Sequence, residues 1–327
     1  MILAGDIGGT NARLAFFDWQ NGELKLLSEA VFPSREHRNL DEIVTRFVEL
    51  QGIRPQSACF GVAGPVQNGR VETSNLPWIV EASRLARELQ LPCALLMNDL
   101  EANAWGIPSL NQADLITLNQ VKGTPSGNQA VIAAGTGLGE AGLYWDGTKY
   151  YVFACEGGHC DFAPRDELEV ELLRYLMARY GHVSYERIVS GPGLVNVFQF
   201  LRDTRRGEEP KWLTEEMAQA DAAPAISRAA LSGHSALAER ALDLWISIYG
   251  AEAGNLALKL KATGGVYLGG GIVPRVLPKL AGPLFMQSFL SKGRLQSLLE
   301  TIPVRVITND KAALLGAARR AALESAC

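Results

Sequence analysis

Residues 130–154 read AVIAAGTGLGEAGLYWDGTKYYVFA, and they repeat a pattern present in residues 2–32, ILAGDIGGTNARLAFFDWQNGELKLLSEAVF. In both stretches an apolar segment enters a glycine-rich turn, a second apolar segment follows, and an Asn-Gly or Asp-Gly turn leads into a third. This alternation predicts a three-stranded meander joined by hairpins. The two copies lie too far apart in sequence for a solenoid, whose repeats are about 20 to 50 residues long, so we expect a duplicated domain.

The first copy continues as alternating helices and strands. Apolar residues at helical spacing predict a helix from Leu40, with Asn39 as its N-cap and Gly52 after its last turn. Short apolar segments at 59–62 and 93–97 predict two more strands, separated by a helix near 81–90. The resulting order, βββαβαβ, is typical of an α/β domain.

The second half of the chain is mostly helical. Its expected helices are 166–180, about 222–241, 242–260 and 310–323, and its expected strands are 265–268 and 304–308. Gly181 closes the first of these helices, and the almost continuously apolar segment 242–260 predicts a buried one. No Pro/Ser-rich linker or low-complexity tract interrupts the chain.

Composition excludes several classes of protein. The 327 residues suggest two domains, and with 47% hydrophobic and 20% charged residues the chain is not disordered. The net charge of -4 provides no basic surface for nucleic acid. No apolar run approaches the ~18 residues of a membrane span, and no secretion signal opens the sequence. Five scattered cysteines make no disulfide framework.

The glycine turn of the first copy is a candidate phosphate site. It begins after Asp6 and carries five residues suited to binding: Gly8, Gly9, Thr10, Asn11 and Arg13. Glycines let backbone amides approach an anion closely, and a carboxylate beside them can hold a divalent cation, as a nucleotide phosphate with its metal requires. A tight hairpin with polar decoration is the alternative. The position of the carboxylate ahead of the glycines favours the binding site.

The glycine turn of the second copy carries four residues of the same kind: Gly135, Thr136, Gly137 and Gly139. Its G-x-G-x-G spacing precedes a predicted strand rather than a helix, which excludes a dinucleotide-binding turn. As the counterpart of the first turn, it is a second candidate for phosphate. A third glycine cluster follows the strand at 265–268 and consists of Gly269, Gly270 and Gly271. By itself this cluster is more typical of a flexible turn.

Polar residues also follow predicted strands. Asn98 and Asp99 come directly after an apolar strand, where open α/β sheets present catalytic groups, although Asp is also a common helix N-cap. Glu156 and His159 flank a glycine pair after another strand and suit a polar ligand with hydroxyl groups, with a solvated turn as the alternative. Cysteines and histidines at 155, 159, 160 and 182 do not favour zinc, because neighbouring residues cannot easily share one tetrahedral ion.

Taken in order, these motifs resemble the bacterial glucokinases, a family of the hexokinase, actin and heat-shock ATPase superfold. The segments that carry the resemblance are 6–13, 61–66, 73–78, 98–99, 135–139, 156–159, 184–187 and 269–274. They span nearly the whole chain. Each motif is weak when taken singly, but their occurrence together in this order is very specific.

The resemblance implies an α/β, duplicated ribonuclease-H-like fold of the actin/hexokinase type, with two domains and a central cleft. A small α/β domain is expected over residues 1–108 plus about 300–327, and a large α/β domain with helical insertions over 109–299. The family also implies a homodimer, and the composition predicts a cytoplasmic protein that binds neither nucleic acid nor membranes.

The implied reaction transfers the γ-phosphoryl group of ATP to the 6-hydroxyl of glucose, giving glucose 6-phosphate and ADP. In the match to the family, Asp99 is the general base. The residues matched to sugar binding are Asn75, Asn98, Asp99, Glu156, His159 and Glu186. The residues matched to nucleotide binding are Asp6, Gly8, Gly9, Thr10, Asn11, Arg13, Gly135, Thr136, Gly137, Gly139, Gly269, Gly270 and Gly271. Asp6 would hold Mg²⁺, directly or through water.

Two features of the sequence depart from related patterns. Glu140 follows the second glycine turn where a small apolar residue is usual, a change expected to bear on nucleotide preference. The cysteine cluster that binds zinc in the related repressor and open-reading-frame kinase family is absent, so the chain resembles the zinc-free branch.

Two alternative functions remain open at this point. The first is a kinase of the same fold that uses another hexose, or polyphosphate or ADP as donor. The second is a non-catalytic, sugar-responsive regulator. A repressor of this fold needs a helix-turn-helix ahead of the first hairpin, where only five residues precede Asp6, and the presence of Asp99 argues against a pure sensor.

Overall fold

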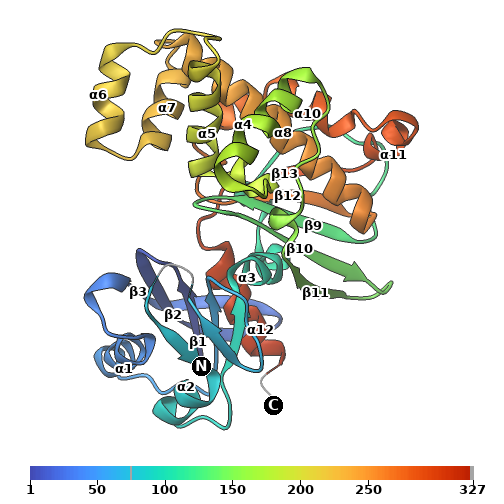
Figure 1. Cartoon of the computed structure of the whole chain (residues 1–327). Helices are drawn as coiled ribbons and strands as arrows, with labels where there is room; N and C mark the ends of the chain where they lie inside the picture. The colour runs from blue at the N-terminus through green and yellow to red at the C-terminus, as the bar shows by residue number, and fades with distance from the viewer. Residues whose placement is uncertain (74–75, 325–327) are drawn as a thin grey trace. The chain divides into compact units, whose positions relative to one another are not determined.

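The computed structural model describes residues 1–73 and 76–324, and the chain divides into two compact units (Figure 1). The first unit comprises Met1–Leu115, Val152–Ala154 and the chain from Asn309 onward. The second unit comprises Ile116–Tyr151 and Cys155–Thr308. Each unit is built around its own mixed β-sheet.

The first unit contains a five-stranded sheet in the order β3-β2-β1-β4-β7. These strands are β3 (Glu23–Pro33), β2 (Asn11–Gln20), β1 (Ile2–Ile7), β4 (Ser57–Val62) and β7 (Leu95–Asn98). β1, β2 and β3 form the antiparallel meander predicted from the sequence, whereas β4 and β7 run parallel to β1. A separate two-stranded sheet pairs β5 (Arg70–Glu72) with β6 (Ile79–Glu81).

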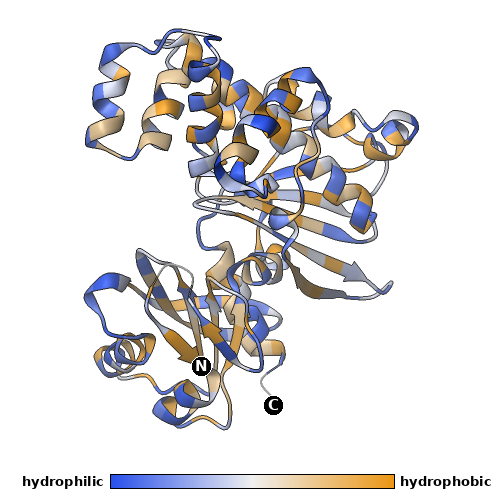
Figure 2. Ribbon diagram, in the orientation of Figure 1, coloured by the Kyte–Doolittle hydropathy of each residue, from blue (hydrophilic) through white to orange (hydrophobic). Residues whose placement is uncertain are grey.

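The first helix of this unit begins and ends where the sequence predicts. α1 (Leu40–Gln51) starts at Asn39, whose side chain accepts a hydrogen bond from Glu42 N, and it stops at Gly52, whose φ of 62° lies in the left-handed region. Figure 2 shows both hydrophilic and hydrophobic residues along α1, as expected for an amphipathic helix. The other helices are α2 (Ala82–Leu89), α3 (Asp99–Gly106) and α12 (Ala312–Leu323).

The second sheet has six strands in the order β11-β10-β9-β12-β13-β8, and its residues belong to the second unit except for Leu115 and Val152–Ala154. These strands are β11 (Tyr150–Cys155), β10 (Leu138–Trp145), β9 (Gln129–Ala134), β12 (Gly265–Gly269), β13 (Val304–Ile307) and β8 (Leu115–Thr117). Its first five strands reproduce the order and directions of the first sheet, with β9 in the place of β1. The predicted duplication is therefore confirmed.

Helices of the second unit depart from the prediction in several places. The expected helix at 222–241 breaks at residues 232–235, and Ser235 caps a new helix with its side chain. Two helices between 191 and 219 and three more between 277 and 299 were not predicted. The helices are α4 (Glu167–Tyr180), α5 (Gly191–Asp203), α6 (Lys211–Gln219), α7 (Ala222–Leu231), α8 (Ala236–Leu260), α9 (Leu277–Leu280), α10 (Pro283–Leu290) and α11 (Gln296–Leu299).

The long helix α8 forms the centre of the second unit's core. Its Trp245 and Tyr249 side chains are fully buried, and each satisfies its polar atom with a backbone carbonyl. Trp245 Nε1 donates to Ser190 O at 3.1 Å, and Tyr249 Oη donates to Ile132 O at 3.0 Å. Because a buried aromatic polar group needs such a partner, these two bonds fix α8 against β9 and the start of α5.

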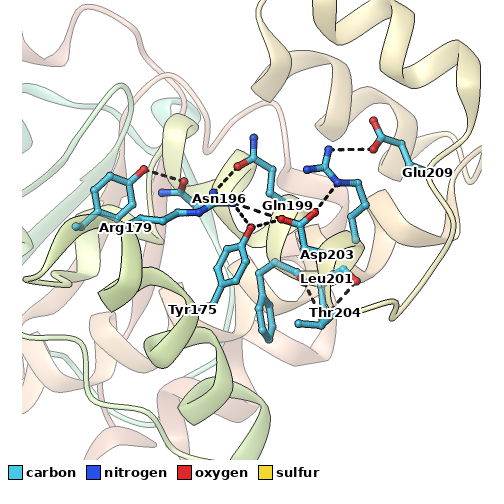
Figure 3. Close-up of polar contacts among 11 residues, drawn as sticks. Tyr175, Arg179, Asn196, Gln199, Leu201, Asp203, Thr204 and Glu209 are labelled. Atoms are coloured by element: carbon cyan, nitrogen blue, oxygen red, sulfur yellow. Dashed lines mark hydrogen bonds and ion pairs between the residues drawn. The ribbon is translucent and has the colours of Figure 1, made fainter.

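A polar network joins α4 to α5 (Figure 3). Tyr175 Oη on α4 donates to Asp203 Oδ2 on α5 at 2.6 Å, and Arg179 on α4 donates to Gln199 Oε1 on α5 at 2.7 Å. Arg202 then links Asp203 to Glu209 in the loop that follows. The network anchors α5, whose first residues lie beside the second glycine turn.

Short 3₁₀ turns complete the described chain: η1 (Ser34–Glu36), η2 (Ile107–Ser109), η3 (Gln112–Asp114), η4 (Gly157–His159), η5 (Tyr185–Arg187) and η6 (Gly293–Leu295). Within residues 1–73 and 76–324, every helix is too short or too polar to cross a lipid bilayer.

Candidate active site

The first glycine turn is a rigid hairpin between β1 and β2. Gly8 N donates to Asn11 O at 2.9 Å, which closes the turn. Ser34 braces it from η1, because its Oγ donates to Gly8 O at 2.8 Å and its backbone N donates to Thr10 O at 2.9 Å. These bonds hold the turn in one shape, as a preformed anion-binding turn requires.

Asp6 lies at the end of β1 opposite Arg13 of β2. Burial raises the pKa of the Asp6 carboxyl to about 6, with Arg13 lowering this pKa and Asp310 raising it. The Arg13 guanidinium itself donates to Asp310, to Oδ2 at 2.9 Å and to the backbone O at 3.1 Å. Its Nε lies 3.6 Å from Glu29 Oε1. In this structure Arg13 therefore holds the start of α12 against the hairpin.

Asp310 is not among the site residues predicted from the sequence. A signal was nevertheless present, because Asn309-Asp310 follows β13 as Asn98-Asp99 follows β7, and β13 is the counterpart of β7 in the duplicated sheet. The duplication thus extends to the polar pair after the last shared strand. Reading the repeat past its first three strands would have identified this residue.

The carboxylates near the first hairpin fit a magnesium ion. Within the part of the chain that the structure describes, no three His, Cys, Asp or Glu side chains gather as a ready-made metal site. Mg²⁺ usually takes one or two carboxylates together with waters and substrate phosphates, so it does not need such a cluster. Asp6, with Asp310 close enough to influence its pKa, meets this requirement.

Asn98 and Asp99 stand where β7 ends and α3 begins. The Asn98 side chain caps α3 by accepting from Leu100 N at 2.8 Å, and its Nδ2 donates to Gly64 O at 3.1 Å. Asn98 thereby connects β7 to the segment after β4. Asp99 is the first residue of α3, and its Oδ1 also accepts from Leu100 N, at 2.9 Å. The capping role weighed from the sequence falls mainly on Asn98.

Three glycine segments meet at the second turn. Gly191 N, at the start of α5, donates to Gly135 O at 2.8 Å. Gly270 packs so closely on the end of β9 that a Cβ there would lie 2.2 Å from Ala134 O, and its φ of 90° also favours glycine. Ser190 caps the start of α5 by accepting from Gly193 N, and this start was not predicted from the sequence.

Glu186 reaches the second turn from η5. Its Oε2 accepts from Leu138 N at 3.0 Å and lies 2.5 Å from the position of a Cβ on Gly137. A residue predicted to bind the sugar thus contacts a turn predicted to bind phosphate. Ser190 strengthens the connection, because its Oγ donates to Glu186 O at 2.7 Å.

The Glu156–His159 segment lies on β10. A Cβ on Gly158 would stand 1.9 Å from Leu138 O, so only glycine allows this approach. Glu156 and His159, on either side of the glycine pair, are exposed and available to a ligand. Cys155 and Cys160, which bracket the segment, are free thiols.

Within each unit the structure brings predicted site residues together. In the first unit these are the hairpin with Asp6 and Arg13, and in the second the turn at 135–139 with Glu186 and Gly270. Asn75 lies outside the described residues. The binding roles given to these residues stay predictions.

Comparison with known proteins identifies the family. A family model described as Glucokinase matches residues 3–324. A glucokinase of Nostoc sp. strain PCC 7120 is 44% identical over 98% of this chain and 99% of its own. The crystal structure of a glucokinase from an Antarctic psychrotroph is 31% identical, with a TM-score of 0.85 over 98% of both chains. A ROK family glucokinase from Streptomyces griseus, solved with glucose and AMPPNP, shares the fold at 21% identity, with a TM-score of 0.64 over 98% of this chain and 99% of that one.

These matches also confirm the predicted fold class, the duplicated α/β fold of the actin/hexokinase type. The family match and the solved relative each cover nearly the whole chain, so the assignment does not rest on one motif or one unit. The chain belongs to the glucokinase family.

Proposed function

We propose that this chain is an ATP-dependent hexose kinase that phosphorylates glucose at its 6-hydroxyl, with Asp99 as the general base. The observation that carries the proposal is the Asn98-Asp99 pair at the carboxyl end of β7, in a chain of the glucokinase family. Asp99 begins α3, and Asn98 is held by a helix cap and by Gly64. A carboxylate fixed in this way has a defined position for accepting a proton.

Phosphoryl transfer requires the enzyme to align the sugar hydroxyl with the γ-phosphate more than to form a covalent intermediate. The 6-oxygen of glucose forms a bond to the γ-phosphorus of ATP, the bond from that phosphorus to the bridging oxygen breaks, and ADP leaves. The proton of the 6-hydroxyl passes to the Asp99 carboxylate. Because the transition state is loose, positioning of the sugar oxygen and neutralisation of phosphate charge account for most of the rate.

Phosphate binding falls to the two glycine turns in this proposal. The braced Gly8–Thr10 turn of the first unit and the Gly135–Gly139 turn of the second offer backbone amides to the phosphates. Asp6, assisted by Asp310, would hold Mg²⁺. When bound, Mg²⁺ neutralises phosphate charge during transfer.

Sugar binding falls to side chains with hydroxyl-binding capacity. Glu156 is the N-cap of η4 and His159 is its last residue, and both are exposed. Together with Glu186, they would form hydrogen bonds with the glucose hydroxyls. Asn75 belongs to the same proposal through its match to the family motif.

We further propose a homodimer in the cytoplasm, since two-fold association is the commonest oligomeric form and family members often adopt it. Light scattering tests the oligomeric state.

Asp99→Asn tests the proposed base. Asparagine keeps the shape and the hydrogen-bonding capacity but cannot take the proton, so kcat should fall by about 10² to 10⁴-fold. Glucose affinity, measured by calorimetry without nucleotide, should fall far less. An assay coupled to ADP release measures kcat, with mannose, fructose and N-acetylglucosamine as alternative acceptors.

The matched control is Glu101→Gln, which removes another carboxylate from α3, one that pairs with Arg320. This variant should keep near-normal turnover. If Asp99→Asn retains more than about a tenth of wild-type kcat, Asp99 is not the base. If another hexose is turned over faster than glucose, that hexose and not glucose is the preferred substrate.

A further inference from the structure

Glu140 on β10 is a buried acid with no use in the mechanism above. Its side chain follows the second glycine turn and is 1% exposed. Among residues 1–73 and 76–324, neither carboxyl oxygen has a hydrogen-bond partner. Buried polar atoms are normally paired, so an orphaned carboxyl beside a ligand-binding segment calls for a functional explanation.

The Glu140 carboxyl lies directly beneath the Glu156–His159 segment. A Cβ on Gly157 would fall 1.8 Å from Glu140 Oε2, so the carboxyl touches the backbone at this glycine. The next residue, Gly158, rests on Leu138 O of the same strand. Glu140 and Leu138 therefore form the floor under the glycine pair. Any displacement of this floor moves Glu156 and His159 together.

We propose that Glu140 is a positioning residue that sets the height of the Glu156–His159 segment, and thereby controls glucose affinity, through the protonation of its carboxyl. The inference rests on the proposed function, since it takes Glu156 and His159 to bind the sugar. It deepens that function by assigning a role to a residue that the family motif does not contain.

The surroundings of Glu140 disfavour its charged form. Burial, together with the neighbouring Glu252 and against an opposing effect of Lys259, raises the pKa of Glu140 to about 8. Glu252 is itself fully buried and already paired, through Oε1 to Lys259 Nζ at 3.1 Å and Oε2 to Asn255 Nδ2 at 2.8 Å. Lys259 is thus committed to Glu252 and leaves Glu140 without a salt bridge of its own.

Other titratable groups face Glu140 from the remaining elements. Tyr249 of α8 and Cys155 of β11 both interact electrostatically with it, and burial raises the pKa of each. Glu156 and His159 lie at the two ends of the segment above it, and the adjoining strand β9 carries no titratable side chain. Neither Tyr249 nor Cys155 supplies a positive charge to a Glu140 carboxylate.

Ionisation of Glu140 should therefore weaken sugar binding. Below about pH 8 the carboxyl is neutral and can stay against Gly157. Above that pH it carries a charge that Glu252 repels and that burial disfavours, and the Gly157 backbone lies directly against it. The segment is then displaced, and glucose selects the protonated form of the enzyme.

Steady-state kinetics from pH 6.5 to 9.5 test this inference with wild type and Glu140→Gln. In the wild type, KM for glucose should rise about tenfold between pH 7 and pH 9, while kcat at saturating glucose changes much less. Glutamine is a neutral mimic of the protonated acid, so Glu140→Gln should keep the KM seen at pH 7 and lose the rise. An equal rise in both proteins overturns the inference.

Glu171→Gln is the control variant. It removes a partly exposed carboxylate on α4 of the same unit that pairs with Arg206 and has no proposed role in ligand binding. This variant should keep the wild-type pH profile. A flattened profile here as well would show that removal of any carboxylate is sufficient, which also overturns the inference.

Thermal unfolding gives a readout that does not depend on activity. An acid whose pKa is higher in the folded chain than its ordinary value of 4.5 destabilises the fold increasingly as pH rises from about 4.5 to 8. Glu140→Gln should therefore melt above the wild type by a margin that widens over this range. If the difference in melting temperature between the two proteins stays constant over this pH range, Glu140 is not a buried acid that remains uncharged.

Calorimetric titration with glucose separates this inference from the proposed function. Weaker glucose binding at pH 9 than at pH 7 in the wild type, but not in Glu140→Gln, supports it. Equal binding at both pH values overturns the inference and leaves the kinase function intact, whereas no glucose binding at any pH removes both.

If Glu140→Gln fails to fold, amide hydrogen exchange of the wild type tests the inference instead. Faster exchange of residues 156–160 at pH 9 than at pH 7, beyond the intrinsic effect of pH on exchange, supports the inference. The absence of such an increase overturns it.

Discussion

At the scale of single residues, side-chain chemistry was easier to predict than side-chain partners. The residue types around the first hairpin indicated a site for phosphate and metal. The sequence did not reveal that Arg13 binds Asp310, because that contact joins residues 297 positions apart. The sequence did mark Glu140 as unusual, but the burial of Glu140 depends on α8, which lies about a hundred residues further along the chain.

Asp6→Asn tests the proposed metal contact. Loss of this carboxylate should raise the Mg²⁺ concentration needed for half-maximal activity by about 10 to 100-fold, the usual cost of removing a group that acts on a metal directly or through water. Glucose binding without nucleotide should not change. Since burial disfavours the charged form of Asp6, the neutral asparagine is not expected to destabilise the fold.

Asp18→Asn is the matched control, because Asp18 lies on the neighbouring strand β2 and contacts Gln20. It should leave the Mg²⁺ requirement unchanged. Titration of activity against Mg²⁺ at fixed ATP checks both variants. An unaltered Mg²⁺ requirement in Asp6→Asn would assign the metal to other residues.

At the scale of elements, capping residues predicted the ends of a helix reliably where the apolar pattern also stopped there. Asn39 and Gly52 fixed both ends of α1, and Asp166 and Gly181 fixed those of α4. The break between α7 and α8 was missed, because the apolar pattern continues on both sides of Gly233 and hides the Ser235 cap. α5 begins with Gly-Pro-Gly, which is typical of a turn, and it forms only because Ser190 and Trp245 hold that end.

The link between η5 and the second glycine turn leads to a prediction about nucleotide binding. Without ligands, the Glu186 carboxylate occupies Leu138 N and places a negative charge on the turn. Glu186→Gln should therefore bind AMPPNP with Mg²⁺ more tightly in the absence of glucose, by roughly fivefold, because removal of one like charge at a partly exposed site is worth about 1 kcal/mol. Calorimetry measures this affinity.

Glucose should be bound less well by the same variant, since Glu186 is one of the proposed sugar ligands. Glu215→Gln on α6 serves as the control and should alter neither affinity. Unchanged or weaker AMPPNP binding by Glu186→Gln would mean that the carboxylate does not oppose phosphate at this turn.

At the scale of the whole molecule, duplication carried most of the predictive power. Two glycine turns in matching meanders predicted two sheets of the same order, and the structure confirms them. The domain boundaries, the cleft and the binding roles stay predictions. They depend on contacts among segments distant in sequence, whereas the repeat is visible in local alternation and turn residues alone.

A ligand that binds only the folded chain stabilises it, and this gives a test of sugar selectivity for the whole molecule. At a hundredfold excess over its dissociation constant, glucose should add about 2.7 kcal/mol to the free energy of unfolding. Fructose at the same concentration should add much less, because the proposed contacts from Glu156, His159 and Glu186 must match the hydroxyl positions of one sugar. Melting temperature, followed by calorimetry with each sugar, measures the difference, with sorbitol as a control for nonspecific stabilisation. Equal shifts with glucose and fructose would contradict a glucose-selective site even if both sugars were phosphorylated.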